Sequence, residues 1–326
     1  MYRLICTFLV CFFLFSPGSA HGKETLNLIL SSLSGLFIGF WEAKEANFFD
    51  KYDLDARLIY IQSAPTVLQA LLAGEGQIAV GGPKPVVDSA LSGGPAVLWG
   101  AVTDVPAFYI MANPEIHSIK ELKGKPVGVT RFGGSADFAM RLVLKSYGLE
   151  PIKDVPLIQI NGGLAAVAAA MSKKLVVAAP FSAPANLIAR RFGAKVLIDL
   201  GTAGIYYPHN AIFSTSIFLH RQRPIALNFL RAYAEGIAHA MNNKPFALQV
   251  IKKYTREDNP QSAEATYEYA MHYVLKVPYV NPRGIAEVLR QSDLANARDA
   301  KPEDFIDSSV VRQIDQEGFY KRLYGR

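Results

Sequence analysis

Two short runs of small and polar residues, near positions 33 and 133, carry the groups best suited to holding a ligand. Hydroxyls in the first run can donate and accept hydrogen bonds. The second exposes backbone N–H groups, and its arginine adds a fork of donors suited to a carboxylate, sulfonate or phosphate. A predicted helix follows each run, and its positive N-terminal end favours anionic or electron-rich groups. The runs are Ser32, Leu33 and Ser34, and Arg131, Phe132, Gly133, Gly134 and Ser135.

A purely structural interpretation of these runs is also open. Serines ahead of a helix act as N-caps, so Ser34 and Ser135 could satisfy backbone N–H groups and nothing else. Arg131 could pair with Asp137, an acid already stabilised by the positive end of its helix. The residue types alone do not separate capping from ligand contact.

Two further groups are candidates for lining a cleft. A Gly-Gly-Pro step directly after a predicted strand permits close approach of the backbone to a bound molecule, and a plain strand-to-helix turn explains it equally well. A tyrosine pair lies near the second predicted crossing between two halves of the chain. These candidates are Gly81, Gly82 and Pro83, and Tyr206 and Tyr207. In contrast, we expect Trp41, Phe48 and Phe49 to be core residues rather than a stacking platform.

Signatures of catalysis and metal binding are missing from the sequence. It contains no phosphate-binding loop, dinucleotide fingerprint, H-E-x-x-H pair or G-x-S-x-G elbow. The six histidines are far apart and have no metal-ligand spacing. Both cysteines, Cys6 and Cys11, lie in a predicted leader, so a mature chain without them has no thiol nucleophile, disulfide or Cys-ligated metal. We therefore expect no catalytic residue, no metal and no cofactor.

The leader is predicted from residues 1–20. Arg3 precedes an apolar run, Leu4–Phe15, and Pro17-Gly18 and small residues follow, which is the layout of a secretory signal peptide cleaved near Ala20. An uncleaved N-terminal anchor is the alternative. Export of a chain whose mature part lacks cysteine suits a bacterial periplasm. No later stretch is long and apolar enough to span a membrane, so we expect the mature protein to be soluble.

The charge composition does not indicate nucleic-acid binding. The 34 Lys and Arg residues exceed the 28 Asp and Glu residues by 6, giving a pI near 9.1. These basic residues are scattered among acids, with no aromatic-interleaved basic stripe, so the excess is an ordinary solvated surface. Half of the residues are hydrophobic, which excludes a disordered chain.

Strand-like and helix-like segments alternate after the leader and predict an α/β fold with mostly parallel sheets. The pattern of strand, small polar loop and helix at Leu26–Phe37 recurs at Pro126–Phe138, so two halves are expected, with their loops at the carboxyl ends of parallel strands, where open α/β sheets bind ligands. Residues 107–112 and 211–219 are predicted to be crossings, and the sequence is helical from Pro224 onward. Predicted strands are 26–30, 56–60, 77–80, 97–102, 126–130, 155–160, 175–179 and 195–200; predicted helices are 35–51, 64–73, 135–147, 164–171 and 186–192.

Three longer stretches carry a family resemblance. They are AKEANFFDKYDLDARLIYIQSAPTVLQALLAGEGQIAVGG (Ala43–Gly82), IHSIKELKGKPVGVTRFGGSADFAMRLVLKSYGLEPIKDV (Ile116–Val155) and ALNFLRAYAEGIAHAMNNKPFALQVIKKYT (Ala226–Thr255). With these stretches in this order, the chain resembles the periplasmic substrate-binding proteins of ABC importers of the nitrate, sulfonate and taurine type, whose relatives include proteins that bind thiamine-pyrimidine precursors.

The resemblance implies a type II periplasmic-binding-protein fold, in which two α/β lobes joined by a two-crossover hinge hold a ligand between them. Lobe 1 would comprise residues 21–110 and 214–326, and lobe 2 residues 111–213. It also implies cleft contacts from the three loops above and from Pro180, Phe181 and Ser182. The chain departs from the family pattern at Gln77, Lys174 and Val177, which weakens the transfer of any particular ligand.

The expected function is therefore capture of a small molecule, without chemistry, and its delivery to a membrane permease by a protein that is a monomer. An organosulfonate-like anion would suit Arg131, whereas a small heterocycle would suit Phe132, Phe181 and the tyrosine pair. The alternatives are a secreted enzyme on the same fold, resembling the pyrimidine-synthesis relatives, and a ligand-sensing partner of a membrane receptor. The relatives that convert a pyridoxal compound use a cysteine-rich motif, which a mature chain without cysteine lacks.

Overall fold

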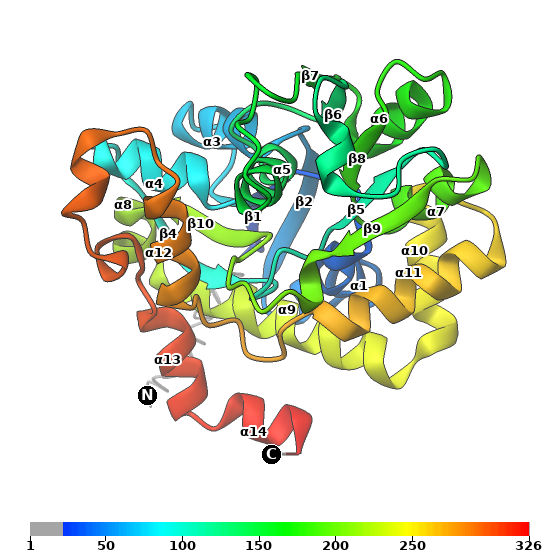
Figure 1. Ribbon diagram of the computed structural model, residues 1–326. Coiled ribbons are helices and arrows are strands. Elements are labelled where there is room, and N and C mark those ends of the chain that lie inside the picture. The colour runs from blue at the N-terminus through cyan, green and yellow to red at the C-terminus, as the bar shows by residue number, and fades with distance from the viewer. Residues whose placement is uncertain (1–21, 326) are drawn as a thin grey trace, which may run out of the picture.

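The computed structural model describes residues 22–325, which form two five-stranded sheets (Figure 1). In the first sheet the order is β2-β1-β3-β10-β4, and in the second it is β7-β6-β8-β5-β9. The strands are β1 (Glu24–Leu30), β2 (Leu54–Tyr60), β3 (Ile78–Gly81), β4 (Ala96–Ala101), β5 (Tyr109–Ala112), β6 (Val127–Val129), β7 (Leu157–Gln159), β8 (Ala178–Phe181), β9 (Lys195–Asp199) and β10 (Ala211–Thr215).

The two sheets are built alike. In the first, β1 pairs in parallel with β2 and β3; in the second, β6 pairs in parallel with β7 and β8. One strand in each sheet is antiparallel to its neighbours and lies next to a crossing between the sheets. Strand β10 runs antiparallel to β3 and β4, and β5 runs antiparallel to β8 and β9. The sheets are thus mixed, and the internal similarity predicted from the sequence corresponds to two equivalent β-α-β-α-β units.

Helices cover both faces of the first sheet because successive side chains of a buried strand point to opposite faces. Leu28 and Leu30 pack with Phe40 of α1 and Phe229 of α9, whereas Ile29 lies in the cluster on the opposite face, with helices α3, α4 and α12. The helices of this lobe are η1 (Gly35–Phe37), α1 (Ile38–Glu45), α2 (Phe48–Lys51), α3 (Ala64–Leu72), α4 (Lys84–Leu91), α8 (Ser216–Arg221), α9 (Arg223–Asn242), α10 (Lys244–Thr255), α11 (Pro260–Tyr273), α12 (Pro282–Arg290), η4 (Ala295–Arg298), η5 (Pro302–Phe305), α13 (Ser309–Gln316) and α14 (Phe319–Tyr324).

The second sheet is covered in the same way. Ile110 and Ala112 of β5 face the cluster that contains α5, and Met111 faces the cluster of α6 and α7. The helices of this lobe are η2 (Ile119–Leu122), α5 (Ser135–Ser146), α6 (Gly163–Ser172), α7 (Ala185–Arg191) and η3 (Leu200–Thr202). Figure 1 shows this sheet at the upper right, with the yellow to orange helices α9 to α11 below it.

Several predicted elements differ from the observed ones for identifiable reasons. The single helix expected over 35–51 is broken between α1 and α2, where Asn47 adopts a left-handed conformation with φ 59°. Helix α4 was not predicted, because Pro85 obscures its start; proline is tolerated there because the first turn needs no N–H donor. Strand β8 lies three residues later than its predicted start, at Ala178.

The crossings between the sheets precede the segments expected. Tyr109 and Ile110, expected in lobe 1, pair in the second sheet, and Ala211–Phe213, expected in lobe 2, pair in the first. The chain therefore passes between sheets at residues 102–108 and 200–210. As expected, the C-terminal helices return to the first lobe, where α9 packs on α1 and α13 on β4.

The predicted leader, residues 1–20, lies outside the described residues. Within 22–325, none of the helices combines the length and apolar character needed to cross a membrane. Trp41 and Phe49 are fully buried and Phe48 is partly buried against the same cluster, which confirms their predicted core role.

Candidate ligand-binding site

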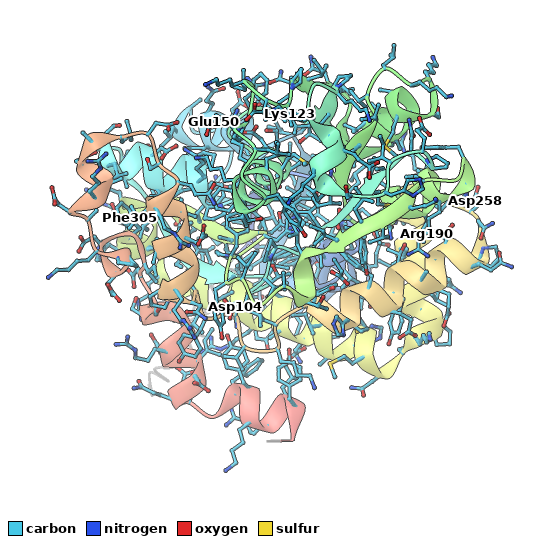
Figure 2. The ribbon with its side chains drawn as sticks, in the orientation of Figure 1. Asp104, Lys123, Glu150, Arg190, Asp258 and Phe305 are labelled. Atoms are coloured by element: carbon cyan, nitrogen blue, oxygen red, sulfur yellow. The ribbon has the colours of Figure 1, made fainter. Side chains whose placement is uncertain are left out.

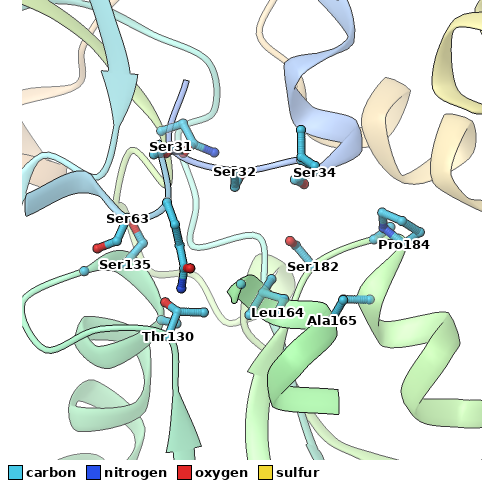
Figure 3. Close-up of a pocket in the computed structure, with 18 of the residues that line it drawn as sticks. Ser31, Ser32, Ser34, Ser63, Thr130, Ser135, Leu164, Ala165, Ser182 and Pro184 are labelled. Carbon is cyan, nitrogen blue, oxygen red and sulfur yellow. Dashed lines mark hydrogen bonds between the residues drawn. The ribbon is translucent and has the colours of Figure 1, made fainter. Parts of the chain in front are cut away.

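A cavity of about 220 Å³ lies where the carboxyl ends of the parallel strands of the two sheets meet. Hydroxyl groups from both lobes line it, together with the apolar side chains of Leu33, Phe108, Leu164 and Ile188. Figure 3 shows the serines that follow β1 on one side of this space and Thr130, Leu164 and Ser182 on the other. The hydroxyl residues are Ser31, Ser32, Ser34, Ser63, Thr130, Ser135, Ser182, Tyr60 and Thr255.

Five helical segments begin at the wall of this pocket. In a β-α-β unit each strand leads into a loop and then a helix, so helix N-termini collect at the carboxyl edge of the sheet. The first N–H groups of a helix have no partner within it and carry partial positive charge. The lining residues at these starts are Ser34 before η1, Ser63 and Ala64 at α3, Gly134 and Ser135 at α5, Gly162 and Gly163 at α6, and Pro184 and Ala185 at α7.

Only two of the lining residues are charged in neutral solution, Arg256 and Glu257. A guanidinium N–H of Arg191 donates to the Glu257 carboxylate at 2.9 Å and a second contact, also 2.9 Å, reaches Ser262. Arg191 ends α7 of the second lobe, whereas Glu257 and Ser262 belong to the first. Glu257 is therefore already neutralised, and the same contacts fasten the two lobes together at one rim of the pocket.

His209 is the one histidine in the lining. Its ring is buried and stacks on Phe108 with centroids 3.9 Å apart. Burial lowers the pKa of His209 to about 3, because the charged form cannot be solvated there. The imidazole is thus neutral near pH 7. Among residues 22–325, no cluster of three or more His, Cys, Asp or Glu side chains is arranged to hold a metal ion.

The lobes touch on opposite sides of the cavity. The N–H of Gly162 donates to Gln62 Oε1 at 2.7 Å, and the N–H of Gly35 donates to the Ala183 carbonyl at 3.1 Å. A Cβ on Gly82 would overlap Ser135 Oγ across the gap. Figure 2 labels Arg190 and Asp258, which flank the Arg191–Glu257 contact, on the same side of the molecule. The structure is therefore the closed arrangement of the two lobes.

About half of the residues predicted from the sequence line the pocket. All three residues of the first run do so, and each of the other predicted loops contributes one or two. The lining residues are Ser32, Leu33, Ser34, Gly82, Gly134, Ser135 and Ser182. The predicted residues that are not part of this lining are Gly81, Pro83, Arg131, Phe132, Gly133, Phe181, Tyr206 and Tyr207.

In the second run, a turn carries the first three residues away from the cavity. Gly133 has φ +76°, and its N–H donates to Asp137 Oδ2 at 2.9 Å. Arg141, not Arg131, pairs with Asp137, at 2.8 Å. Phe132 is exposed, and the Arg141 guanidinium lies over its ring. The expected alternative, a pair between Arg131 and Asp137, is therefore not formed.

The remaining predicted residues are occupied in other ways. Gly81 belongs to β3, and Pro83 is the N-cap residue of α4. Phe181 is fully buried in the core under α7. Tyr207 is also buried: its ring stacks on Phe138 with centroids 4.2 Å apart, and its hydroxyl lies 3.4 Å from Ser135 Oγ, so it supports a lining residue from behind. Tyr206 stacks under the Arg283 guanidinium.

Several further residues that were not predicted from the sequence also line the pocket. Ser63 and Gly162-Gly163 follow strands and precede helices, so the rule used for the other loops could have found them. His209 and Asn210 on the second crossing, and Thr255–Glu257 at the end of α10, have no local signature. They reach the pocket through tertiary packing alone.

A family model described as NMT1/THI5 like matches residues 35–245. Among curated proteins the sequence has no match.

Three solved structures share the architecture. The alkanesulfonate-binding protein SsuA from Xanthomonas axonopodis pv. citri, bound to MOPS, superimposes with a TM-score of 0.71 at 16% identity over 90% of this chain and 98% of that one. The aliphatic sulphonate binding protein SsuA from Escherichia coli gives 0.70 at 18% identity, over 89% and 91%. The nitrate-binding protein NrtA from Synechocystis PCC 6803 gives 0.68 at 14%, over 90% and 89%. The second and third are described as periplasmic binding proteins, and this chain has the fold of all three.

Proposed function

The chain belongs to the family described as NMT1/THI5 like, and on that premise we propose that it is the solute-binding component of an ABC importer. It captures a small molecule between its two lobes and delivers it to a membrane permease. The location that goes with this role is the periplasm, reached through the predicted leader of residues 1–20, and the working form is a monomer.

The observation that carries this proposal is a cavity lined from both lobes. A ligand that touches both half-sites stabilises the closed form over the open one, so binding shifts the population of the two states. The contacts at Gln62, Gly35 and Arg191 across the rim of the cavity define that closed form. A permease that distinguishes the closed from the open shape can then respond only to the loaded protein.

The lining also narrows the chemistry of the ligand. Helix N-termini and hydroxyls supply hydrogen-bond donors, so the deepest part of the ligand must be rich in acceptors, either a sulfonate-like anion or the acceptor edge of a small heterocycle. Leu33, Phe108 and Leu164 contact its carbon atoms. A cationic ligand is disfavoured, because the carboxylate of Glu257 is already paired with Arg191.

Binding without chemistry follows from the same residues. A general acid or base works best with a pKa near the working pH, and burial lowers the pKa of His209 to about 3. Glu257 is held in its ion pair. We therefore expect the ligand to be released unchanged, as import requires and a secreted enzyme does not.

A thermal-shift screen tests the proposal directly. The mature protein is heated with nitrate, methanesulfonate, taurine, MOPS, small carboxylates and pyrimidines, because a ligand that prefers the folded state raises Tm. We expect at least one acceptor-rich compound to raise Tm, with calorimetry confirming one site and mass spectrometry finding the compound intact. A new product would instead support the secreted enzyme. If no compound of any class raised Tm, the proposed solute-binding function would be contradicted.

A further inference from the structure

The pocket continues into a second, more open groove on the first lobe. This outer groove shares Leu33, Tyr60 and Arg256 with the inner pocket. It runs between the edge strand β2 and the ends of α1 and α10. Its lining residues are Leu33, Lys44, Glu45, Ala56, Arg57, Leu58, Tyr60, Lys253, Tyr254 and Arg256.

The charges of the groove differ from those of the pocket. Four cations, Lys44, Arg57, Lys253 and Arg256, line it, against the single carboxylate of Glu45. That carboxylate accepts hydrogen bonds from Lys253 at 2.7 Å and from the Tyr254 hydroxyl at 2.8 Å. Burial alone would raise the pKa of Glu45, but these two donors outweigh it and lower the pKa. Glu45 is thus ionised and occupied by Lys253, and Arg57 pairs with Asp55 at 3.5 Å. Lys44 and Arg256 therefore supply the excess positive charge of the groove.

Arg256 stands at the junction of the two cavities. It follows the last residue of α10 in a left-handed conformation, φ 55° and ψ 32°, with its N–H bonded to the Lys252 carbonyl. Within residues 22–325, no carboxylate lies at ion-pair distance from its guanidinium, because the adjacent Glu257 is taken by Arg191. Arg256 is therefore an exposed cation with its charge free, at the mouth of the pocket.

We propose that the outer groove is a second subsite, which binds an anionic group at the far end of an elongated ligand. This inference rests on the proposed function, since the inner pocket must first hold the other end. Helix N-termini and hydroxyls bind the acceptor-rich head inside, and Arg256, with Lys44 also in the groove, binds a sulfonate, carboxylate or phosphate outside. Arg256 then favours ligands with a negative charge at the outer end, whether the inner end is charged or neutral.

Matched probes isolate the contribution of the outer charge. The first pair is pentane-1-sulfonate and 1,5-pentanedisulfonate, and the second is 3-(pyrimidin-5-yl)propanamide and 3-(pyrimidin-5-yl)propanoate. Within each pair the end meant for the pocket is the same. The first pair differs by the whole outer sulfonate group, and the second, nearly isosteric pair differs in the outer charge. In at least one pair, we expect the member with the outer negative charge to bind about fivefold more tightly than its partner at low ionic strength, as for one solvent-exposed ion pair. The gain should shrink as salt screens it.

A pair of variants assigns that gain to Arg256. Arg256→Gln removes the charge and keeps a polar side chain. Lys174→Gln is the matched control, since Lys174 is also an exposed cation in a left-handed conformation, with φ 59°, but lies past the far end of α6, where it is outside both cavities. We expect the two members of each pair to bind Arg256→Gln with equal affinity, so that the gain is lost, and Lys174→Gln to keep it.

The outcomes separate the two proposals. If the parent probes bind but the outer charge adds nothing, or Arg256→Gln keeps the whole gain, the second subsite is overturned and the solute-binding function stands. If no probe of either pair and no compound of the screen binds the wild-type protein, the proposed function fails and the subsite fails with it. Circular dichroism of each variant verifies that it is folded.

Discussion

The loops after β1 and β6 occupy equivalent places in the two lobes and behave differently. Both follow the strand that lies between two parallel neighbours, and both lead into a helix. In the first loop Ser31, Ser32, Leu33 and Ser34 all line the pocket. In the second loop, which begins at Thr130, Arg131–Gly133 turn away from it and only the residues at the helix start return to it.

Local hydrogen bonds account for the difference. The first loop stays along the sheet edge because the Ser31 N–H donates to the Val80 carbonyl at 3.0 Å and the Ser34 hydroxyl caps η1. In the second loop, the Phe132 N–H donates to Gln159 Oε1 at 3.1 Å. This bond draws the loop toward β7, and Gly133 turns it back. The lesson is that helix N-termini mark pocket residues more reliably than the composition of the loop before them.

The largest expected effect comes from a negative charge placed just after the turn at Gly133, and the matched control is the same charge placed just before it. Gly134→Asp adds bulk and a carboxylate inside the pocket, so we expect affinity for the best compound of the screen to fall at least about a thousandfold, a loss of roughly 4 kcal/mol. Aspartate is a favoured N-cap, so the helix should still form. Phe132→Asp adds the same charge two residues earlier, outside the lining, and should leave affinity within about twofold. Calorimetry measures both, and equal losses would erase the distinction.

A second prediction concerns the pH dependence of stability and the buried His209 on the second crossing. The His209 carbonyl accepts a hydrogen bond from the Ser135 hydroxyl, in the loop after β6, at 3.0 Å. The unfolded chain binds a proton at His209 below about pH 6.5, whereas the folded protein does not until about pH 3. The unfolded state therefore binds more protons in this window, and stability falls as pH falls. We expect His209 to contribute a loss of about 3 kcal/mol between pH 7 and pH 4.

Urea unfolding of the wild type and of His209→Asn at both pH values measures this loss. The raised pKa of Glu42, caused by its burial, acts in the opposite direction but is common to both proteins and cancels in the difference. An equal pH dependence in the two proteins would mean that His209 is solvated in the folded state.

A third prediction tests what holds the two lobes together at the rim of the pocket. Arg191→Gln removes the bonds to Glu257 and Ser262, each 2.9 Å long. Because this pair is partly solvent-exposed, we expect a modest effect, about fivefold weaker binding expressed mainly as faster dissociation. Arg190→Gln removes the neighbouring exposed charge, which has no bond across the rim, and serves as the control. Stopped-flow dissociation rates that do not differ between the variants would show that other contacts close the lobes.

Sequence alone could predict the two-lobed α/β fold, because alternating strands and helices and one repeated strand-loop-helix pattern set its topology. It could also predict Ser34, Gly82 and Ser135, each of which directly follows a strand or starts a helix. Phe181 shows a limit of this approach: the strand expected to end at Ala179 continues to Phe181, and alternation turns that side chain into the core.

Other parts of the site had no local signal. Asn210 lies on the second crossing, and Arg256 follows α10, which is far from that crossing in the sequence. Only the tertiary fold brings these two residues to one cavity. The free charge of Arg256 depends on Arg191 having taken Glu257, a contact between residues 66 positions apart. The charge that sequence analysis assigned to Arg131 is instead supplied, at the pocket mouth, by a residue of the other lobe.

The smallest expected effect concerns Arg131. Arg131→Gln removes the guanidinium that the sequence favoured as an anion contact, but the turn at Gly133 carries it outside the lining. We expect affinity for any sulfonate of the screen to change less than about twofold, since Arg131 is not part of the lining and salt screens a solvated charge that does not contact the ligand. A loss above fivefold, measured by calorimetry beside Arg256→Gln, would mean that the second loop rearranges around the ligand and comes to line the pocket over its whole length, as the first already does.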